Sequence, residues 1–266
     1  MLIKVTNRCG MGCSHCLENS TPAGEHMTEE TFDKAMEFTR RVEGRAWALG
    51  LPPMVLVSGG ECTEHPDIVK FIEALVAWGV RPMLLTNGMW LANKELRASL
   101  LRPEWKQLLF QVTNDPRFYP RAPERVQDPR VVYVDSLSVF VALGRGRRKI
   151  MGDVPMRKAP ASFNLRSITR SLGSIESAII KLRARAALGS AGHCTPSITH
   201  EGWVMAGESR HCARIGTVDS TNEELTRALL EMGECDNCGL EARLDAQHRQ
   251  AIGLTATTLT DETVAR

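Results

Sequence analysis

Hydrophobic residues alternate between continuous runs and helical spacings along the first 113 residues. Residues 54–57 (Met-Val-Leu-Val) form a continuous apolar run, as expected of a parallel strand covered on both faces. In the segments 28–44 and 66–78, apolar residues instead recur at the spacing of one helix face. The same patterns predict strands at 2–6, 82–86 and 107–113, and a helix at 91–101. This alternation predicts an α/β fold, with βα units around a parallel sheet or partial barrel.

The pattern becomes irregular after residue 114. Four prolines between residues 116 and 130 leave little room for a crossover helix, and the strand-like segments 131–134 and 137–143 lie too close together to be successive parallel strands. Further along, the sequence predicts a helix at 174–188, a hairpin at 198–205 with Gly202 in its turn, and a helix at 222–232. We place a domain boundary near residue 190, which gives a core over 1–190, a small Cys-rich extension over 191–245 and a tail over 246–266.

The composition is that of a globular protein. With 266 residues, of which 43% are hydrophobic and 24% charged, the chain can bury one sizeable core and carry an appendage. No run approaches the ~18 apolar residues of a membrane span, and residues 1–8 contain no secretory signal. We therefore expect a cytoplasmic protein, in which eight cysteines are better suited to metal ligation than to disulfides.

The charge is unevenly distributed. Residues 145–193 contain 11 Lys and Arg but two Asp and Glu, although the whole chain has a formal net charge of +2. Such a block can attract an anionic substrate or partner, or can simply form a solvated loop and helix face. It contains one aromatic residue, Phe163, so platforms for stacking nucleic-acid bases are scarce.

Three cysteines follow the first predicted strand directly. Cys9, Cys13 and Cys16 have the spacing C-x3-C-x2-C. Three thiolates on a short loop can hold three irons of a 4Fe–4S cluster and leave the fourth iron open. An open iron can bind and polarise a small molecule, as an open catalytic zinc position does. The alternative is a zinc site completed by His15 or His26.

The second predicted strand ends in two glycines and a carboxylate. The segment Ser58-Gly59-Gly60-Glu61 lies at the carboxyl end of the strand, where βα folds build their sites. Glycines there let the backbone approach a ligand closely, and Glu61 can pair with an ammonium group. Gly-Gly-Glu alone is more often a turn. The cysteines that follow the preceding strand support its interpretation as a binding motif.

With these two motifs the sequence resembles the radical SAM superfamily over roughly residues 1–145. The resemblance implies a partial βα barrel in which Cys9, Cys13 and Cys16 hold a 4Fe–4S cluster, and S-adenosylmethionine chelates the fourth iron through its amino and carboxylate groups. It also implies that His15 lies near the adenine and that Ser58, Gly59, Gly60 and Glu61 contact the methionine amino group.

Other parts of the resemblance are looser. Thr113 or Asn114, at the end of the fourth predicted strand, would approach the ribose, and Leu143-Gly144-Arg145 is similar to a motif near the end of the barrel. Cys62 stands where the family often has proline. It is either a small core residue or a thiol that faces the substrate.

Four further cysteines form a C-terminal group with a closing C-x2-C pair: Cys194, Cys212, Cys235 and Cys238. Four thiolates can form a tetrahedral zinc site or bind a 4Fe–4S cluster, and spacing alone does not decide between them. The arrangement resembles the twitch module, a shortened relative of the SPASM domain. That resemblance implies a second, auxiliary 4Fe–4S cluster.

The resemblance implies an enzyme that cleaves S-adenosylmethionine reductively to a 5′-deoxyadenosyl radical, which then abstracts a hydrogen atom from a substrate. We expect oxidative modification of a peptide, with dehydrogenation or cyclisation of a small molecule as the alternative. The chain starts at the first strand, so a peptide substrate would need a separate recruiter. The expected partner is an electron donor such as flavodoxin or ferredoxin. A zinc-binding, nucleic-acid interaction protein is the alternative from another class, but it leaves Glu61 and its glycines unexplained.

Overall fold

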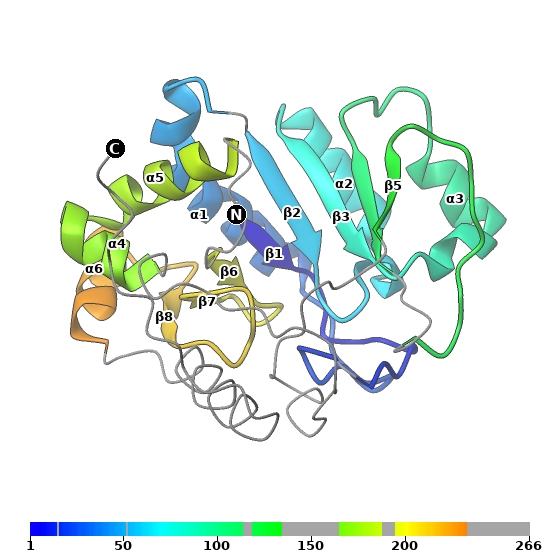
Figure 1. Cartoon of the computed structure of the whole chain (residues 1–266), viewed down its shortest axis with the longest axis horizontal. Helices are drawn as coiled ribbons and strands as arrows, with labels where there is room; N and C mark the ends of the chain where they lie inside the picture. Colours follow the sequence, from blue (N-terminus) through cyan, green and yellow to red (C-terminus); the bar gives the residue numbers. More distant parts are fainter. Residues whose placement is uncertain (15, 52, 114–118, 135–164, 188–194, 233–266) are drawn as a thin grey trace, which may run out of the picture.

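A computed structural model describes residues 1–14, 16–51, 53–113, 119–134, 165–187 and 195–232 of the chain. Within these ranges one eight-stranded sheet has the order β5-β4-β3-β2-β1-β6-β7-β8 (Figure 1). The parallel part consists of β1 (Leu2–Lys4), β2 (Met54–Ser58), β3 (Arg81–Thr86), β4 (Leu109–Thr113), β5 (Val131–Val134) and β6 (Ser197–Ile198). Strands β7 (Trp203–Met205) and β8 (Arg214–Thr217) continue the sheet in antiparallel pairing. The predicted α/β fold is confirmed, and its parallel-rich sheet is consistent with a partial barrel.

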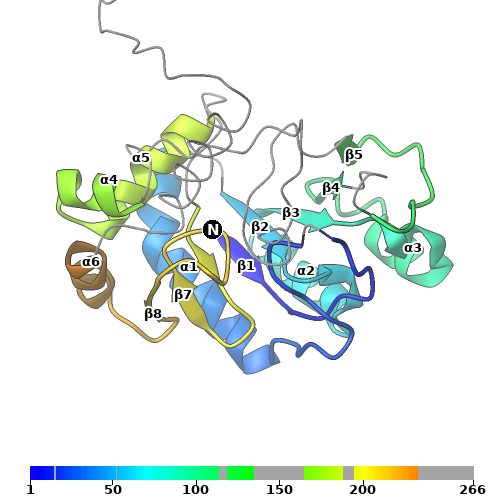
Figure 2. The ribbon, with the colours of Figure 1, turned by 60° about the horizontal axis from the view of Figure 1, so that its bottom comes forward.

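The helices pack around the sheet. Helices α1 (Glu29–Ala48), α2 (Ile68–Ala77) and α3 (Lys94–Leu100) follow β1, β2 and β3, and short 3-10 turns at Cys62–Glu64 and Met89–Ala92 precede α2 and α3. Helices α4 (Leu165–Leu172), α5 (Ile175–Ala187) and α6 (Asn222–Glu231) gather beyond the β6–β8 end of the sheet, and both views show this grouping (Figures 1 and 2). Helix α5 packs against α1, and α6 packs against β8.

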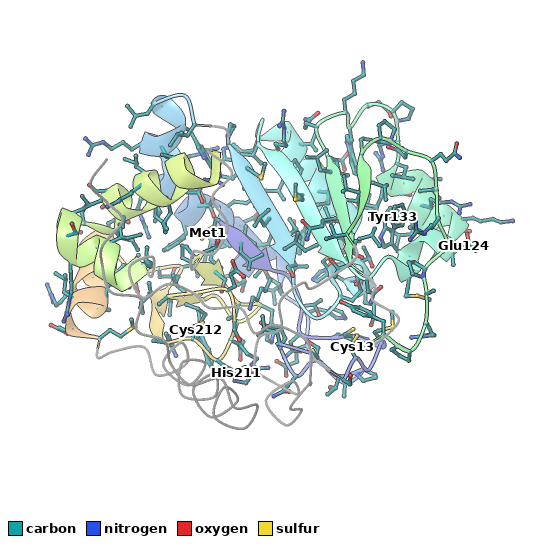
Figure 3. The ribbon with its side chains drawn as sticks, in the orientation of Figure 1. Met1, Cys13, Glu124, Tyr133, His211 and Cys212 are labelled. Carbon is teal, nitrogen blue, oxygen red and sulfur yellow. The ribbon has the colours of Figure 1, made fainter. Side chains whose placement is uncertain are left out.

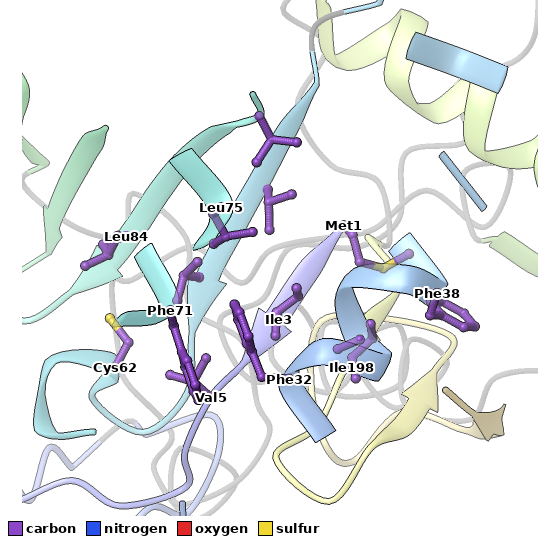
Figure 4. Packing of buried hydrophobic residues seen from close by; sticks show 14 of the residues in the cluster. Met1, Ile3, Val5, Phe32, Phe38, Cys62, Phe71, Leu75, Leu84 and Ile198 are labelled. Atoms are coloured by element: carbon purple, nitrogen blue, oxygen red, sulfur yellow. The ribbon is translucent and has the colours of Figure 1, made fainter. Parts of the chain in front are cut away.

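The main core lies between the sheet and helices α1 and α2. Successive residues of a strand point to opposite faces, and Ile3 and Val5, both with no exposed surface, face the helices. The rings of Phe32 on α1 and Phe71 on α2 are stacked with centroids 4.0 Å apart (Figure 4). This apolar layer holds the strands in place and leaves their opposite face to form the site described below.

Two predicted helix boundaries were wrong. Helix α1 begins as predicted after Thr28, whose side chain accepts a hydrogen bond from the Thr31 amide, but it continues through Gly44 to Ala48. The predicted helix at 91–101 is divided, because Asn93 caps a new helix by accepting hydrogen bonds from the amides of Glu95 and Leu96. A glycine is tolerated inside a helix at modest cost, whereas an Asx cap starts a new one.

The C-terminal hairpin forms as predicted, with Gly202 at a φ of 82° in its turn. Its first strand, β6, pairs with β1, so residues 197–217 extend the same sheet. The domain boundary near residue 190 remains a prediction, because residues 188–194 lie outside the described part. The predicted strand 137–143 lies outside it as well, whereas residues 131–134 form β5 beside β4. None of the helices in the described ranges has the length and apolar character needed to cross a membrane.

Candidate active site

The two predicted motifs line one cavity of about 340 Å³ at the carboxyl ends of the central parallel strands. Each strand contributes its last residues, namely Lys4 from β1, Ser58 from β2, Thr86 from β3 and Thr113 from β4. The other walls come from the loops that follow these strands, with Cys9, Cys13, Cys16, Leu17, Glu18, Gly59, Gly60, Glu61, Asn87 and Tyr119, and from the β7–β8 loop, with Glu208. Parallel strands present their carboxyl ends at one edge, and this topology brings the motifs together.

The cysteine loop forms one wall of the cavity. Cys9 and Cys13 are buried and Cys16 is half-buried, and they pack with Met11, Met89 and Tyr119 (Figure 3 labels Cys13). Burial is the largest cause that raises the pKa of the Cys9 thiol to about 11, and nearby carboxylates add to it. A buried thiolate beside acidic groups needs compensating positive charge, which a bound metal centre supplies.

Three thiols on one loop are the number of ligands that a 4Fe–4S cluster with one open iron requires. Among the residues that the structure describes, no three His, Cys, Asp or Glu side chains converge on one point, as ligands of a single ion must. Each thiolate of a cluster binds a different iron, so such convergence is not required. His26 does not line the cavity but lies edge-on to the His65 ring, with centroids 4.9 Å apart. His15 lies outside the described residues.

The two glycines hold the second motif against the chain that leads to the cysteines. The amide of Gly60 donates a hydrogen bond to the Thr6 carbonyl, and the amide of Glu61 donates one to the Arg8 carbonyl, each at 2.8 Å. A Cβ on Gly59 would lie 2.2 Å from the Thr6 carbonyl oxygen, and one on Gly60 would lie 2.2 Å from that of Arg8. The close approach expected toward a ligand is thus first of all an approach toward the protein's own backbone.

Glu61 is buried at the junction of β2 and β3. Its Oε1 accepts hydrogen bonds from the Thr63 amide, the Thr63 hydroxyl and the Thr86 hydroxyl, and its Oε2 accepts one from the Asn87 amide at 2.7 Å. Burial raises the pKa of this carboxyl, and the hydrogen bonds oppose that shift. A carboxylate oxygen can accept about two hydrogen bonds, so Oε2 retains capacity for a cavity ligand.

The structure places one of the remaining predicted residues in the cavity wall and another in the core, and it does not describe the others. Thr113 lines the cavity, whereas Asn114 and the segment 143–145 lie outside the described residues. Cys62 has no exposed surface and belongs to the main core, as Figure 4 shows, and its Sγ lies 3.6 Å from the Leu85 carbonyl oxygen. Cys62 therefore does not face the cavity.

Sequence reasoning missed three charged residues of the cavity wall, of which two form a pair. Lys4 Nζ donates a hydrogen bond of 2.7 Å to Glu18 Oε1, and both side chains line the cavity. A lysine inside an otherwise apolar strand was the available signal. Glu208 and Tyr119 were also missed, because nothing in their local sequence distinguishes them from ordinary loop residues.

One member of the C-terminal quartet is described. Cys212 lies half-buried in the loop between β7 and β8, where its amide donates a hydrogen bond to the Ser209 carbonyl (Figure 3). Glu208 of the same loop lines the cavity. Cys194, Cys235 and Cys238 lie outside the described residues, so the predicted four-thiolate site stays a prediction.

Known proteins are similar to part of this chain. No protein-family model matches it. A PqqA peptide cyclase from Ruegeria pomeroyi is 33% identical over 102 residues, which cover 37% of this chain and 25% of the relative. An AdoMet-dependent heme synthase from Methanosarcina barkeri is 34% identical over 102 residues, which cover 36% of this chain and 27% of the relative. The chain thus spans about a quarter of the length of these curated relatives.

Among solved structures, S-adenosylmethionine-bound SuiB from Streptococcus suis superposes with a TM-score of 0.45 at 10% identity. That superposition covers 82% of this chain and 63% of SuiB.

Proposed function

We propose that this chain, a member of the radical SAM superfamily, holds a 4Fe–4S cluster on Cys9, Cys13 and Cys16 and reductively cleaves S-adenosylmethionine in the cavity beside it. The observation that carries the proposal is that the cysteine loop, the Gly59–Glu61 segment and Thr113 line the same cavity. These are three separate stretches of sequence, of which the first two resemble specific motifs of that superfamily and the third resembles one loosely.

When bound, the cluster would supply the electron that cleaves S-adenosylmethionine and so generates the radical that removes a hydrogen atom from a substrate. The chain's own residues bind and orient the reactants. Glu61 would accept a hydrogen bond from the methionine ammonium through Oε2, and Ser58 and the two glycines would border the same group. Thr113 would contact the ribose from the end of β4. The apolar packing of Met11, Met89 and Tyr119 around the cysteines would limit access of water.

The decisive experiment replaces the three ligands together. We expect Cys9→Ala/Cys13→Ala/Cys16→Ala to lose about four irons per chain after anaerobic reconstitution and to form no 5′-deoxyadenosine with dithionite. Cys62→Ala is the matched control, because Cys62 is buried in the core and does not line the cavity. Undiminished 5′-deoxyadenosine formation by the triple variant would exclude the proposed function.

For the substrate we propose a peptide that undergoes oxidative modification. Support comes from the similarity of part of the chain to a PqqA peptide cyclase. A small molecule is the second candidate, because the other relative is named as a heme synthase. Incubating the reconstituted enzyme with candidate peptides or tetrapyrroles and following loss of hydrogen by mass spectrometry separates the two. A flavodoxin or ferredoxin would replace dithionite as the electron donor in the cell.

We further propose that Cys194, Cys212, Cys235 and Cys238 hold an auxiliary 4Fe–4S cluster, with zinc as the alternative metal. Support comes from the β7–β8 loop, which carries Cys212 and also extends Glu208 into the cavity wall. A metal centre attached to that loop would lie next to the substrate, and a cluster there could accept an electron from it.

A further inference from the structure

Lys4 breaks the apolar pattern of the strand that contains it. Strand β1 lies inside the sheet between β2 and β6, where strands of parallel sheets are usually continuously apolar. Its neighbours Ile3 and Val5 have no exposed surface, and Lys4 itself is 4% exposed. A local violation of the folding pattern at an otherwise regular position is typical of a functional residue.

Stability does not account for the lysine. Its ammonium is paired with Glu18 at 2.7 Å, and the two side chains are 6% and 12% exposed. Removing two charges from water costs about as much free energy as their mutual attraction returns. Replacing a buried ion pair by apolar residues is therefore often neutral or stabilising. A leucine or valine at position 4 would continue the strand without that cost.

Lys4 lines two hollows among the described residues, and the cavity of about 340 Å³ is the one with room for a ligand, since the other has about 10 Å³. Leu2 and Lys4 line the cavity, whereas Ile3 faces the helices. Lys4 is paired in register with Ser58, the residue directly before the Gly59–Glu61 segment. An ammonium has three N–H donors, and among the residues that the structure describes Lys4 has one acceptor, Glu18. Two donors are thus available on a side chain that opens onto the cavity.

The charges of the cavity make Lys4 distinctive. Among the described residues that line it, Lys4 is the single lysine or arginine, and the acidic ones are Glu18, Glu61 and Glu208. A carboxylate entering this cavity would therefore meet three like charges and one attractive partner. Glu18 holds the ammonium in place, as the partner of a buried charge must.

We propose that Lys4 is the carboxylate-binding residue of the cavity, an inference that rests on the proposed function for the cavity's role as the active site. Two molecules could supply the carboxylate: the methionine part of S-adenosylmethionine, or a substrate that is an organic acid or an acidic peptide. The chemistry at Lys4 is the same for both, and binding measurements distinguish them.

The test uses the reconstituted protein with two probes, S-adenosylmethionine measured by calorimetry and trifluoroacetate measured by 19F NMR. We expect Lys4→Met to weaken binding of a carboxylate about tenfold or more, the equivalent of one charge-assisted hydrogen bond. Lys106→Met, which removes an exposed lysine, is the matched control and should bind both probes like the wild type. The double variant Lys4→Met/Glu18→Gln removes both charges, so Glu18 is not left buried without a partner if the single variant folds poorly.

The two binding measurements identify which molecule supplies the carboxylate. A rise in the dissociation constant of S-adenosylmethionine, together with displacement of trifluoroacetate by it, assigns the methionine carboxylate. Weaker binding of trifluoroacetate alone, measured with S-adenosylmethionine already bound, assigns a substrate acid. Equal binding of both probes by wild type, Lys4→Met and the double variant overturns the proposal. Failure of the wild type to form 5′-deoxyadenosine would instead contradict the proposed function, and the trifluoroacetate measurement needs no turnover.

Discussion

Oε1 of Glu61 already accepts its full number of hydrogen bonds, whereas Oε2 can accept another one from a ligand. Glu61 is therefore a sharp test of ligand binding at the residue scale. Glu61→Gln keeps the size of the side chain but removes the charge. We expect the free energy of S-adenosylmethionine binding to weaken by about 1.5–3 kcal/mol, because a charge-assisted hydrogen bond to an ammonium becomes a neutral one. Calorimetry on the reconstituted protein measures this. Glu73→Gln on the outer surface of α2 should leave the affinity unchanged.

The pH dependence of binding follows from the same carboxyl. Burial raises the pKa of Glu61 above its usual 4.5, so in the folded protein the group takes up a proton at a higher pH than in the unfolded chain. As the pH falls through this raised pKa, the neutral acid loses its attraction for an ammonium, and affinity for S-adenosylmethionine should fall. The Glu61→Gln variant should lack this dependence in the same pH range. An identical pH profile in both proteins would show that Glu61 does not contact the ligand.

At the residue scale, the sequence allowed prediction of those residues whose role follows from their near neighbours in the chain. The spacing of Cys9, Cys13 and Cys16 on one loop indicates metal ligation without knowledge of the fold. The partners of Glu61 could not be predicted, because Thr86 and Asn87 reach it from the end of the next strand, 25 and 26 residues further along. The same applies to the pairing of Lys4 with Glu18, which depends on how the cysteine loop returns over the sheet.

At the scale of elements, the contact between the Gly59–Glu61 segment and the Thr6–Arg8 chain gives a testable prediction. Gly60→Ala would place a Cβ 2.2 Å from the Arg8 carbonyl oxygen, so the two backbones must separate. We expect a loss of unfolding free energy of about 1–3 kcal/mol, and poorer iron incorporation, because the displaced chain leads directly to Cys9. Chemical denaturation and an iron assay measure the two effects.

Gly44→Ala is the matched control for that variant. Gly44 lies inside helix α1, and an added Cβ would meet no atom within 4 Å. Alanine in a helix interior should stabilise the protein by about 0.5–1 kcal/mol relative to glycine. A Gly60→Ala protein as stable as Gly44→Ala would contradict the tight backbone packing described above.

Most elements were predictable because each has its own periodic signal. Continuous apolar runs indicated the parallel strands, and the Thr28 cap fixed the start of α1. Strand β6 was found only as part of a hairpin, since it has two residues, and its pairing with β1 leaves no local trace in the sequence. Pairing of distant segments depends on the packing of the whole chain, which no window of residues contains.

At the scale of the whole molecule, the number of metal centres is the main prediction. With two 4Fe–4S clusters the reconstituted chain should contain about eight irons, and replacing Cys194, Cys212, Cys235 and Cys238 together should leave about four. That variant should still cleave S-adenosylmethionine but should not complete oxidation of the substrate. Iron, sulfide and zinc analysis on the same sample measures this. About four irons and one zinc per wild-type chain would contradict the auxiliary cluster while leaving the first one in place.

The central position of β1 has a consequence for how the protein is made. One edge of β1 pairs with β2, from residues 54–58, but the other edge pairs with β6, from residues 197–198. During synthesis the ribosome must add more than a hundred residues after β2 before that second edge can be covered. Until then a chain that already carries its three cysteines presents an unpaired strand edge, which is prone to aggregate. Cluster insertion before the β6–β8 segment emerges from the ribosome would therefore occur on an incomplete sheet, and productive iron delivery in the cell should follow translation of that segment.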